Sequence, residues 1–85
     1  MYEILFSDTA MKKLKKLEKK QQIRIINALE RIRIRPEHFV KRLVGCPYYR
    51  LRVGDYRVIL DIKKDKLIIL VVTMGNRDKI YNSFD

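Results

Sequence analysis

Three arginines alternate with apolar residues in one short segment of the chain. Residues 49–60 read YRLRVGDYRVIL, which places Arg50, Arg52 and Arg57 around a central Gly-Asp pair. Alternation with a period of two is typical of strands, and Gly-Asp is a suitable two-residue hairpin turn. Side chains alternate between the two faces of a strand. This turn therefore predicts that all three guanidinium groups share one face, with Arg52 directly opposite Arg57.

Phosphate binding is the chemistry that such a face favours. Like charges directly opposite each other on a sheet repel, so folding alone gives no reason for the cluster. The one acid expected on that face of the hairpin is Asp61, two pairs further along. Guanidinium groups bind phosphate oxygens in bidentate fashion and stay charged at every relevant pH. We therefore predict a phosphate-binding face, the alternative being edge residues that simply face water.

Two residues near the C-terminus extend this prediction. Arg77 follows the expected last strand, and Tyr81 comes four residues later. Positive charge lowers the pKa of a nearby phenol, so a tyrosine beside arginines is a candidate for proton transfer. The spacing fits equally well a surface charge and an aromatic residue that pins the tail.

The N-terminal half has the pattern of a strand followed by helices. Residues 2–6 are β-prone, and Ser7 and Asp8 are favourable N-cap residues for the helix that follows. Apolar residues at helical spacing continue until Pro36, which disfavours helix in the residue before it. A break near residues 18–21 lets both apolar stripes face one core. A helical hairpin is therefore favoured over one long helix.

The C-terminal half predicts a loop and three strands. The loop covers residues 36–48, and the strands cover about 48–53, 56–62 and 67–74. Short connections make these strands antiparallel neighbours. Together with the leading strand, they predict an α+β fold with two N-terminal helices packed on a small, mainly antiparallel four-stranded sheet. The whole chain, residues 1–85, is predicted to be a single domain.

The charge of the chain indicates a polyanionic partner. Twenty Lys and Arg residues against ten Asp and Glu give a net charge of +10 at pH 7 over 85 residues. Such a field attracts nucleic acid. The lysine-rich part of the helical region is predicted to contact RNA phosphates, the alternative being a solvated helix face. Its candidate residues are Lys12, Lys13, Lys16, Lys19 and Lys20.

Cysteine and histidine usage bears on location and cofactors. The single cysteine, Cys46, cannot form an internal disulfide, which suits a reducing cytoplasm. No Cys/His spacing suggests a zinc site, so neither a metal nor another cofactor is predicted. No apolar run approaches the length of a transmembrane helix. We therefore expect a cytoplasmic protein without a membrane partner.

Two runs of residues resemble the RelE toxins of the RelE/ParE superfamily. They are RLVGCPYYRLRVGDYRVILDI (residues 42–62) and MGNRDKIY (residues 74–81), and the resemblance extends over the whole chain. It implies two N-terminal helices on an antiparallel sheet, and a toxin encoded with a RelB-like antitoxin. RelE-like members cut messenger RNA in the ribosomal A site, without metal, by attack of the ribose 2′-hydroxyl on the adjacent phosphate. ParE-like members instead inhibit DNA gyrase.

The resemblance also implies roles for individual residues. Arg57 matches the hairpin arginine that holds the scissile phosphate, and Arg77 matches the arginine near the leaving 5′ oxygen. Tyr81 matches a tyrosine that serves as general base or stacks on a base. Arg50 and Arg52 occupy positions where many members carry lysine. Because arginine effectively cannot lose its proton, these two are expected to stabilise charge and position RNA.

Taken together, the residues and the resemblance predict a ribosome-dependent endoribonuclease. The alternatives are a ParE-like inhibitor of gyrase and a basic nucleic-acid-binding module without catalysis. Apolar residues are also expected beside the arginines, partly exposed, as a patch that an acidic antitoxin segment covers. They are Ile59, Ile68, Leu70 and Val72.

Overall fold

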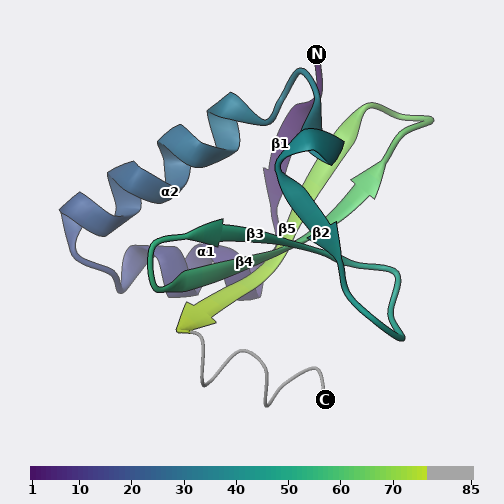
Figure 1. The fold of residues 1–85 in the computed structure, drawn as a ribbon. Helices are drawn as coiled ribbons and strands as arrows, with labels where there is room; N and C mark the ends of the chain where they lie inside the picture. Colours follow the sequence, from purple (N-terminus) through teal and green to yellow (C-terminus); the bar gives the residue numbers. More distant parts are fainter. Residues whose placement is uncertain (77–85) are drawn as a thin grey trace.

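Two helices cover one face of a five-stranded sheet in the computed structural model, which describes residues 1–76 (Figure 1). In the sheet, β1 pairs in parallel with β5, and the other neighbours are antiparallel. The α+β class and the mainly antiparallel sheet are thus confirmed. The strand order is β1-β5-β4-β3-β2, with β1 at Glu3–Phe6, β2 at Val40–Arg42, β3 at Tyr49–Val53, β4 at Tyr56–Lys63 and β5 at Ile68–Asn76.

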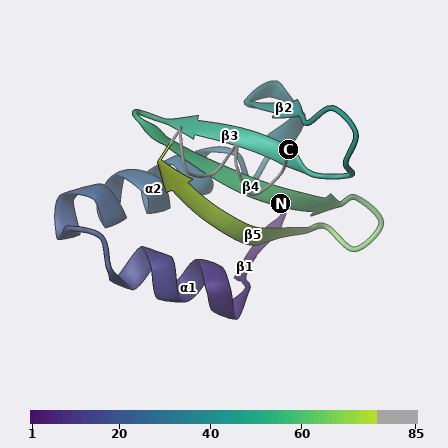
Figure 2. The ribbon, with the colours of Figure 1, turned by 90° about the horizontal axis from the view of Figure 1, so that it is seen from below.

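The two helices form the predicted helical hairpin. They are α1 (Asp8–Lys15) and α2 (Lys19–Arg31), and Figure 2 shows both on the same side of the sheet. Ser7 caps α1 as predicted, since its Oγ accepts a hydrogen bond from the Ala10 amide at 3.0 Å. The same hydroxyl donates to the Val72 carbonyl at 2.6 Å. This one side chain therefore fixes the start of α1 against β5.

The core lies between the helices and the sheet. Burial of a leucine or isoleucine side chain contributes about 1.5–3 kcal/mol to the free energy of folding. Every second residue of β3 and β4 is held in this core, so the residues between them point to the other face of the sheet. The buried helix residues are Ala10, Leu14, Ile25, Leu29 and Ile32, and the buried strand residues include Leu51, Val53, Val58, Leu60, Ile69, Val71 and Met74.

The sheet has one more strand than the sequence predicted. The segment interpreted as a loop, residues 36–48, contains a 3-10 helix, η1 (Pro36–His38), and the edge strand β2. β2 pairs with Tyr49–Leu51 of β3. Three residues are too few to show a period-two pattern, which is why sequence analysis missed this strand.

Candidate functional site

The β3–β4 hairpin carries the arginines in the predicted register. Arg52 pairs with Arg57 across the Gly54–Asp55 turn, and Arg50 pairs with Ile59. Gly54 has φ of 60°, which suits a type II′ turn with glycine at its first central position. The residues next to these arginines in β3 and β4, such as Leu51, Val53 and Val58, are buried against the helices. The three arginines therefore lie on the opposite side of the sheet. This side is called the arginine face below.

Arg57 is the most enclosed of the three arginines, with only 4% of the residue exposed. Its Nη1 donates to the carbonyls of Gly54 and Tyr56, both at 3.2 Å. Its Nε is buried and has no hydrogen-bond partner among the described residues. Within residues 1–76, no carboxylate lies within 4.0 Å of the Arg57 guanidinium. In residues 1–76 the turn thus holds a buried cation through carbonyl groups and not through a carboxylate, an arrangement that opposes folding.

The acid predicted on this face has a lysine as an ion-pair partner. Asp61 pairs with Lys63, at 3.2 Å between Oδ2 and Nζ. Arg52 is exposed, and Arg50 is intermediate in burial. The residue opposite Arg57 on β5 is Gly75, and a glycine inside a strand often marks a close approach of a ligand. The strand pairing therefore puts no side chain of β5 directly opposite Arg57.

Three of the four apolar residues predicted beside the arginines are partly exposed as expected, and Ile59 is the exception. Ile59 pairs with Arg50, and it is buried, with 1% exposure. Ile68, Leu70 and Val72 are intermediate in burial. The strand pairing places Leu70 opposite Asp61, whereas Val72 falls at a register shift in the pairing of β4 with β5. A bulge of this kind interrupts the alternation that the sequence prediction assumed.

The predicted RNA-binding lysines form a separate region. Lys12, Lys13, Lys16, Lys19 and Lys20 are all exposed on α1, on the connection to α2 and at the start of α2. They belong to the helical layer, whereas the arginines lie across the sheet. Lys13 is the best positioned of them, because its Nζ donates to Thr73 Oγ1 of β5 at 2.9 Å. Thr73 pairs with Ile59 of the arginine face, so Lys13 reaches this face, whereas the other four lysines belong to the helical layer.

Two predicted catalytic residues, Arg77 and Tyr81, lie outside the described residues, so their positions stay predictions. Within residues 1–76, no group of three or more His, Cys, Asp or Glu side chains is placed to hold a metal ion. No helix in the described part of the chain is long and apolar enough to cross a membrane.

Sequence analysis missed a second cluster of arginines beside the hairpin. Arg24, Asn27 and Arg31 of α2 line a cavity of about 350 Å³ that also reaches Arg52 and Gly54. Their spacing of three and four residues was the available signal, since it places all three on one side of a helix. That they face β3 follows only from the packing of α2.

Comparison with known proteins places the chain in a toxin family. Residues 4–81 match the family model described as the ParE toxin of the type II toxin-antitoxin system parDE. The chain belongs to the RelE/ParE superfamily of type II toxins. An Escherichia coli protein described as RelE-like is 29% identical over 86 residues, covering 95% of this chain and 90% of that protein.

Solved structures of RelE toxins share the fold of this superfamily member. The intact RelBE toxin-antitoxin complex of Escherichia coli matches with a TM-score of 0.77 and 25% identity, covering 89% of this chain and 96% of the matched chain. The archaeal RelE-RelB complex of Pyrococcus horikoshii matches with a TM-score of 0.76 and 28% identity, covering 89% and 94%.

Proposed function

We propose that this toxin is a ribosome-dependent endoribonuclease that cleaves messenger RNA in the A site. The observation that carries the proposal is the state of Arg57, a guanidinium fixed by the hairpin turn, buried, and without a carboxylate partner among the described residues. Buried polar atoms are nearly always hydrogen-bonded, so the unpartnered Nε of Arg57 calls for an explanation. A phosphate oxygen supplies the missing acceptor.

In the proposed reaction, the ribose 2′-hydroxyl loses its proton as its oxygen attacks the adjacent phosphorus. The bond from phosphorus to the 5′-oxygen breaks, and this oxygen takes up a proton. The products are a 2′,3′-cyclic phosphate and a 5′-hydroxyl. Negative charge grows on the phosphoryl oxygens in the transition state, where a preorganised guanidinium lowers the barrier. Arg57 takes this role, and exposed Arg52 positions the RNA.

The remaining roles come from the resemblance. Arg77 is assigned to the leaving oxygen, Tyr81 to the proton of the 2′-hydroxyl or to stacking on a base, and Arg50 to charge stabilisation. Because so little of Arg57 is accessible, binding of RNA has to include a local rearrangement around its guanidinium. In this respect the site differs from an open basic surface.

A cleavage assay tests the proposal. Ribosomes are programmed with messenger RNA, and the 5′ ends of fragments are mapped after addition of the toxin. The wild-type protein should cut within the A-site codon, and Arg57→Ala should reduce the rate at least about a hundredfold, as loss of a transition-state donor does. Arg35→Ala removes an exposed arginine elsewhere and should leave the rate nearly unchanged. Intact message with the wild-type toxin would refute the proposal.

A partner belongs to the same proposal. The Escherichia coli and Pyrococcus relatives were crystallised as complexes of RelE with RelB. For this chain we propose a RelB-like antitoxin that covers the arginine face and places acidic side chains against Arg52. Such a cover would inhibit the toxin by occupying the position of RNA.

Inhibition of DNA gyrase is the second candidate function. The observation that favours it is the family match itself, whose description names ParE. In that case the hairpin arginines serve protein binding. A supercoiling assay with purified gyrase separates the two functions, because an endoribonuclease leaves supercoiling unchanged.

A further inference from the structure

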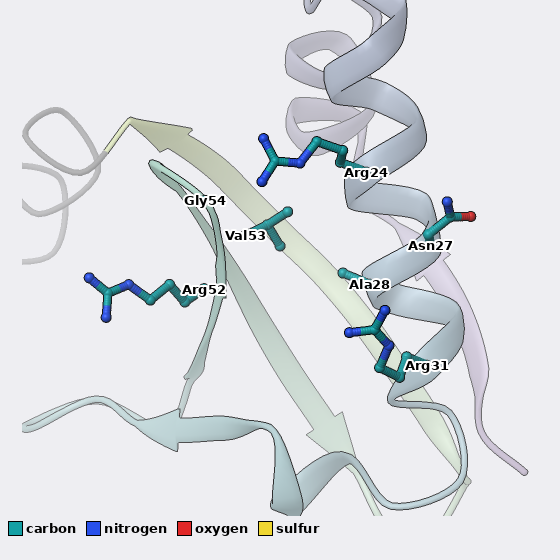
Figure 3. Close-up of a pocket in the computed structure, with 7 residues that line it drawn as sticks. All are labelled: Arg24, Asn27, Ala28, Arg31, Arg52, Val53 and Gly54. Atoms are coloured by element: carbon teal, nitrogen blue, oxygen red, sulfur yellow. The ribbon is translucent and has the colours of Figure 1, made fainter.

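A cleft between α2 and the free end of β3 lies beside the hairpin turn. It has a volume of about 350 Å³, within the range of small-ligand sites. β2 begins at Val40, opposite Leu51, which leaves the edge of β3 at Arg52 and Val53 uncovered by β2. Figure 3 shows Arg31 reaching from α2 toward β3, and Arg24 lying near the turn at Gly54. The cleft is therefore lined by cations from α2 and bounded by a strand edge.

The described part of the chain offers no acid to compensate the charge of this cleft. Its lining contains Arg24, Arg31 and Arg52, together with the amide of Asn27, and no acidic residue. The acid next to Arg31 in the chain, Glu30, is paired with Arg33 at 2.9 Å. Among the described residues, no carboxylate lies within 4.0 Å of Arg24 or Arg31. Converging guanidinium groups without acids favour an anion that offers several oxygens.

The turn residue is adapted to the position of Arg24. A Cβ atom added at Gly54 would lie 2.9 Å from Nη2 and 3.3 Å from Nη1 of Arg24. The missing side chain thus lets the guanidinium rest over the turn that also holds Arg57 through the Gly54 carbonyl. One glycine therefore connects the cleft with the arginine face.

Arg52 links the two regions directly. It lines the cleft, yet its guanidinium extends away from α2 toward the arginine face in Figure 3. A chain of regularly spaced phosphates can follow this path around the uncovered strand edge. The net charge of +10 over 85 residues attracts nucleic acid, and guanidinium groups bind phosphate oxygens in bidentate fashion, so a nucleic acid strand is the occupant that we infer.

We propose that the cleft of Arg24, Asn27 and Arg31 binds a backbone phosphate of single-stranded RNA, distinct from the phosphate at Arg57. This inference deepens the proposed function, because a second phosphate contact orients the strand that Arg57 acts on. The guanidinium groups take the phosphate oxygens, and the Asn27 amide donates a further hydrogen bond. The substrate class is single-stranded RNA.

Salt-dependent binding of an uncleavable RNA tests the proposal. The probe is a short 2′-O-methyl RNA, which lacks the attacking hydroxyl, and the protein is the full chain. The double variant Arg24→Gln/Arg31→Gln is compared with Arg35→Gln/Lys66→Gln, which removes the same charge from exposed residues outside the cleft. Each lost phosphate contact lowers the slope of log K against log salt by about 0.7 for a single strand. The slope of the cleft variant should fall by about 0.7, which corresponds to one lost phosphate contact, and that of the control variant by less than half as much.

Several outcomes would overturn the inference. Equal slopes for the two double variants would show that the cleft contributes only net charge. A larger loss of affinity for poly-L-glutamate than for RNA in the cleft variant would identify an acidic polypeptide as the occupant. Melting curves of both variants should match the wild type, since the replaced side chains are exposed.

The same design separates this inference from the proposed nuclease activity. The probe cannot be cleaved, so the slopes report binding whether or not the toxin is a nuclease. If the wild type cleaves messenger RNA but the two double variants have equal salt slopes, only the cleft proposal is overturned. If the message stays intact but the salt slope falls more in the cleft variant than in the control, only the nuclease proposal is overturned.

Discussion

The hairpin arginines and the helix lysines are both basic, but the structure holds them in different ways. Strand pairing sets Arg52 directly opposite Arg57, and two carbonyls of the turn bind the Arg57 guanidinium. The lysines are exposed, and only Lys13 has a described hydrogen bond, to Thr73. The first region therefore fixes charge at defined positions, whereas the second mainly supplies a field. Catalysis needs the former, and association needs only the latter.

Replacement of Arg57 should change the rate of messenger RNA cleavage more than any other substitution in the two basic regions. Arg57→Met keeps a long side chain in the buried position but deletes the uncompensated charge. Cleavage of messenger RNA should fall at least about a hundredfold. The free energy of unfolding should stay constant or rise by about 1 kcal/mol, because a buried unpaired cation opposes folding. Such a rise moves the melting temperature up by about 4–8 °C for a domain of this size.

A structural role for Arg57 makes the opposite prediction. If its two hydrogen bonds mainly stabilise the turn, Arg57→Met should lower the melting temperature along with activity. Thermal denaturation followed by circular dichroism distinguishes the two. A drop of more than a few degrees would assign Arg57 to the fold and weaken its assignment to the chemistry.

The turn offers a second and smaller perturbation. Gly54→Ala puts a β-carbon on a residue with φ of 60° and within 2.9 Å of the Arg24 guanidinium. The left-handed backbone alone costs about 1 kcal/mol, and the contact shifts a flexible side chain. Stability to urea should fall by about 1 kcal/mol or slightly more.

Gly45→Ala is the matched control for this turn. Gly45 has φ of 77°, but its added Cβ meets nothing within 4 Å. Gly45→Ala should lower the stability to urea through its backbone conformation alone and should leave RNA binding unchanged. If Gly54→Ala leaves RNA binding equally unaffected, the position of Arg24 over the turn does not matter for the ligand.

The hairpin could be predicted from sequence because its signals are local. Alternation, a Gly-Asp turn and the two-residue loop specify the register, and the pairing of Arg52 with Arg57 follows. The burial of Arg57 could not be predicted in this way. It depends on the turn carbonyls and on the packing around the strand, which period-two alternation does not encode.

Features that depend on contacts between distant segments were also beyond the sequence. β2 is a three-residue edge strand that exists only because β3 offers it a partner. The register shift beside Val72 changes the pairing of β5 without any marker such as glycine or proline at that position. The cleft requires the side of α2 that carries Arg24 to meet the end of β3. In each case tertiary packing, and not local preference, decides the outcome.

Single lysine replacements should give the smallest effects and complete the comparison. Lys12→Gln, Lys16→Gln, Lys19→Gln or Lys20→Gln should each raise the KM for programmed ribosomes about twofold and leave kcat unchanged, since exposed charges act through long-range attraction. The shift should shrink as salt rises and the Debye length falls toward about 3 Å. Lys66→Gln, an exposed lysine outside this region, serves as the control. A loss of kcat that persists at high salt would mean that the lysine contributes a fixed contact in the reaction, as proposed for Arg57, and the division between a positioned site and a diffuse field would then fail.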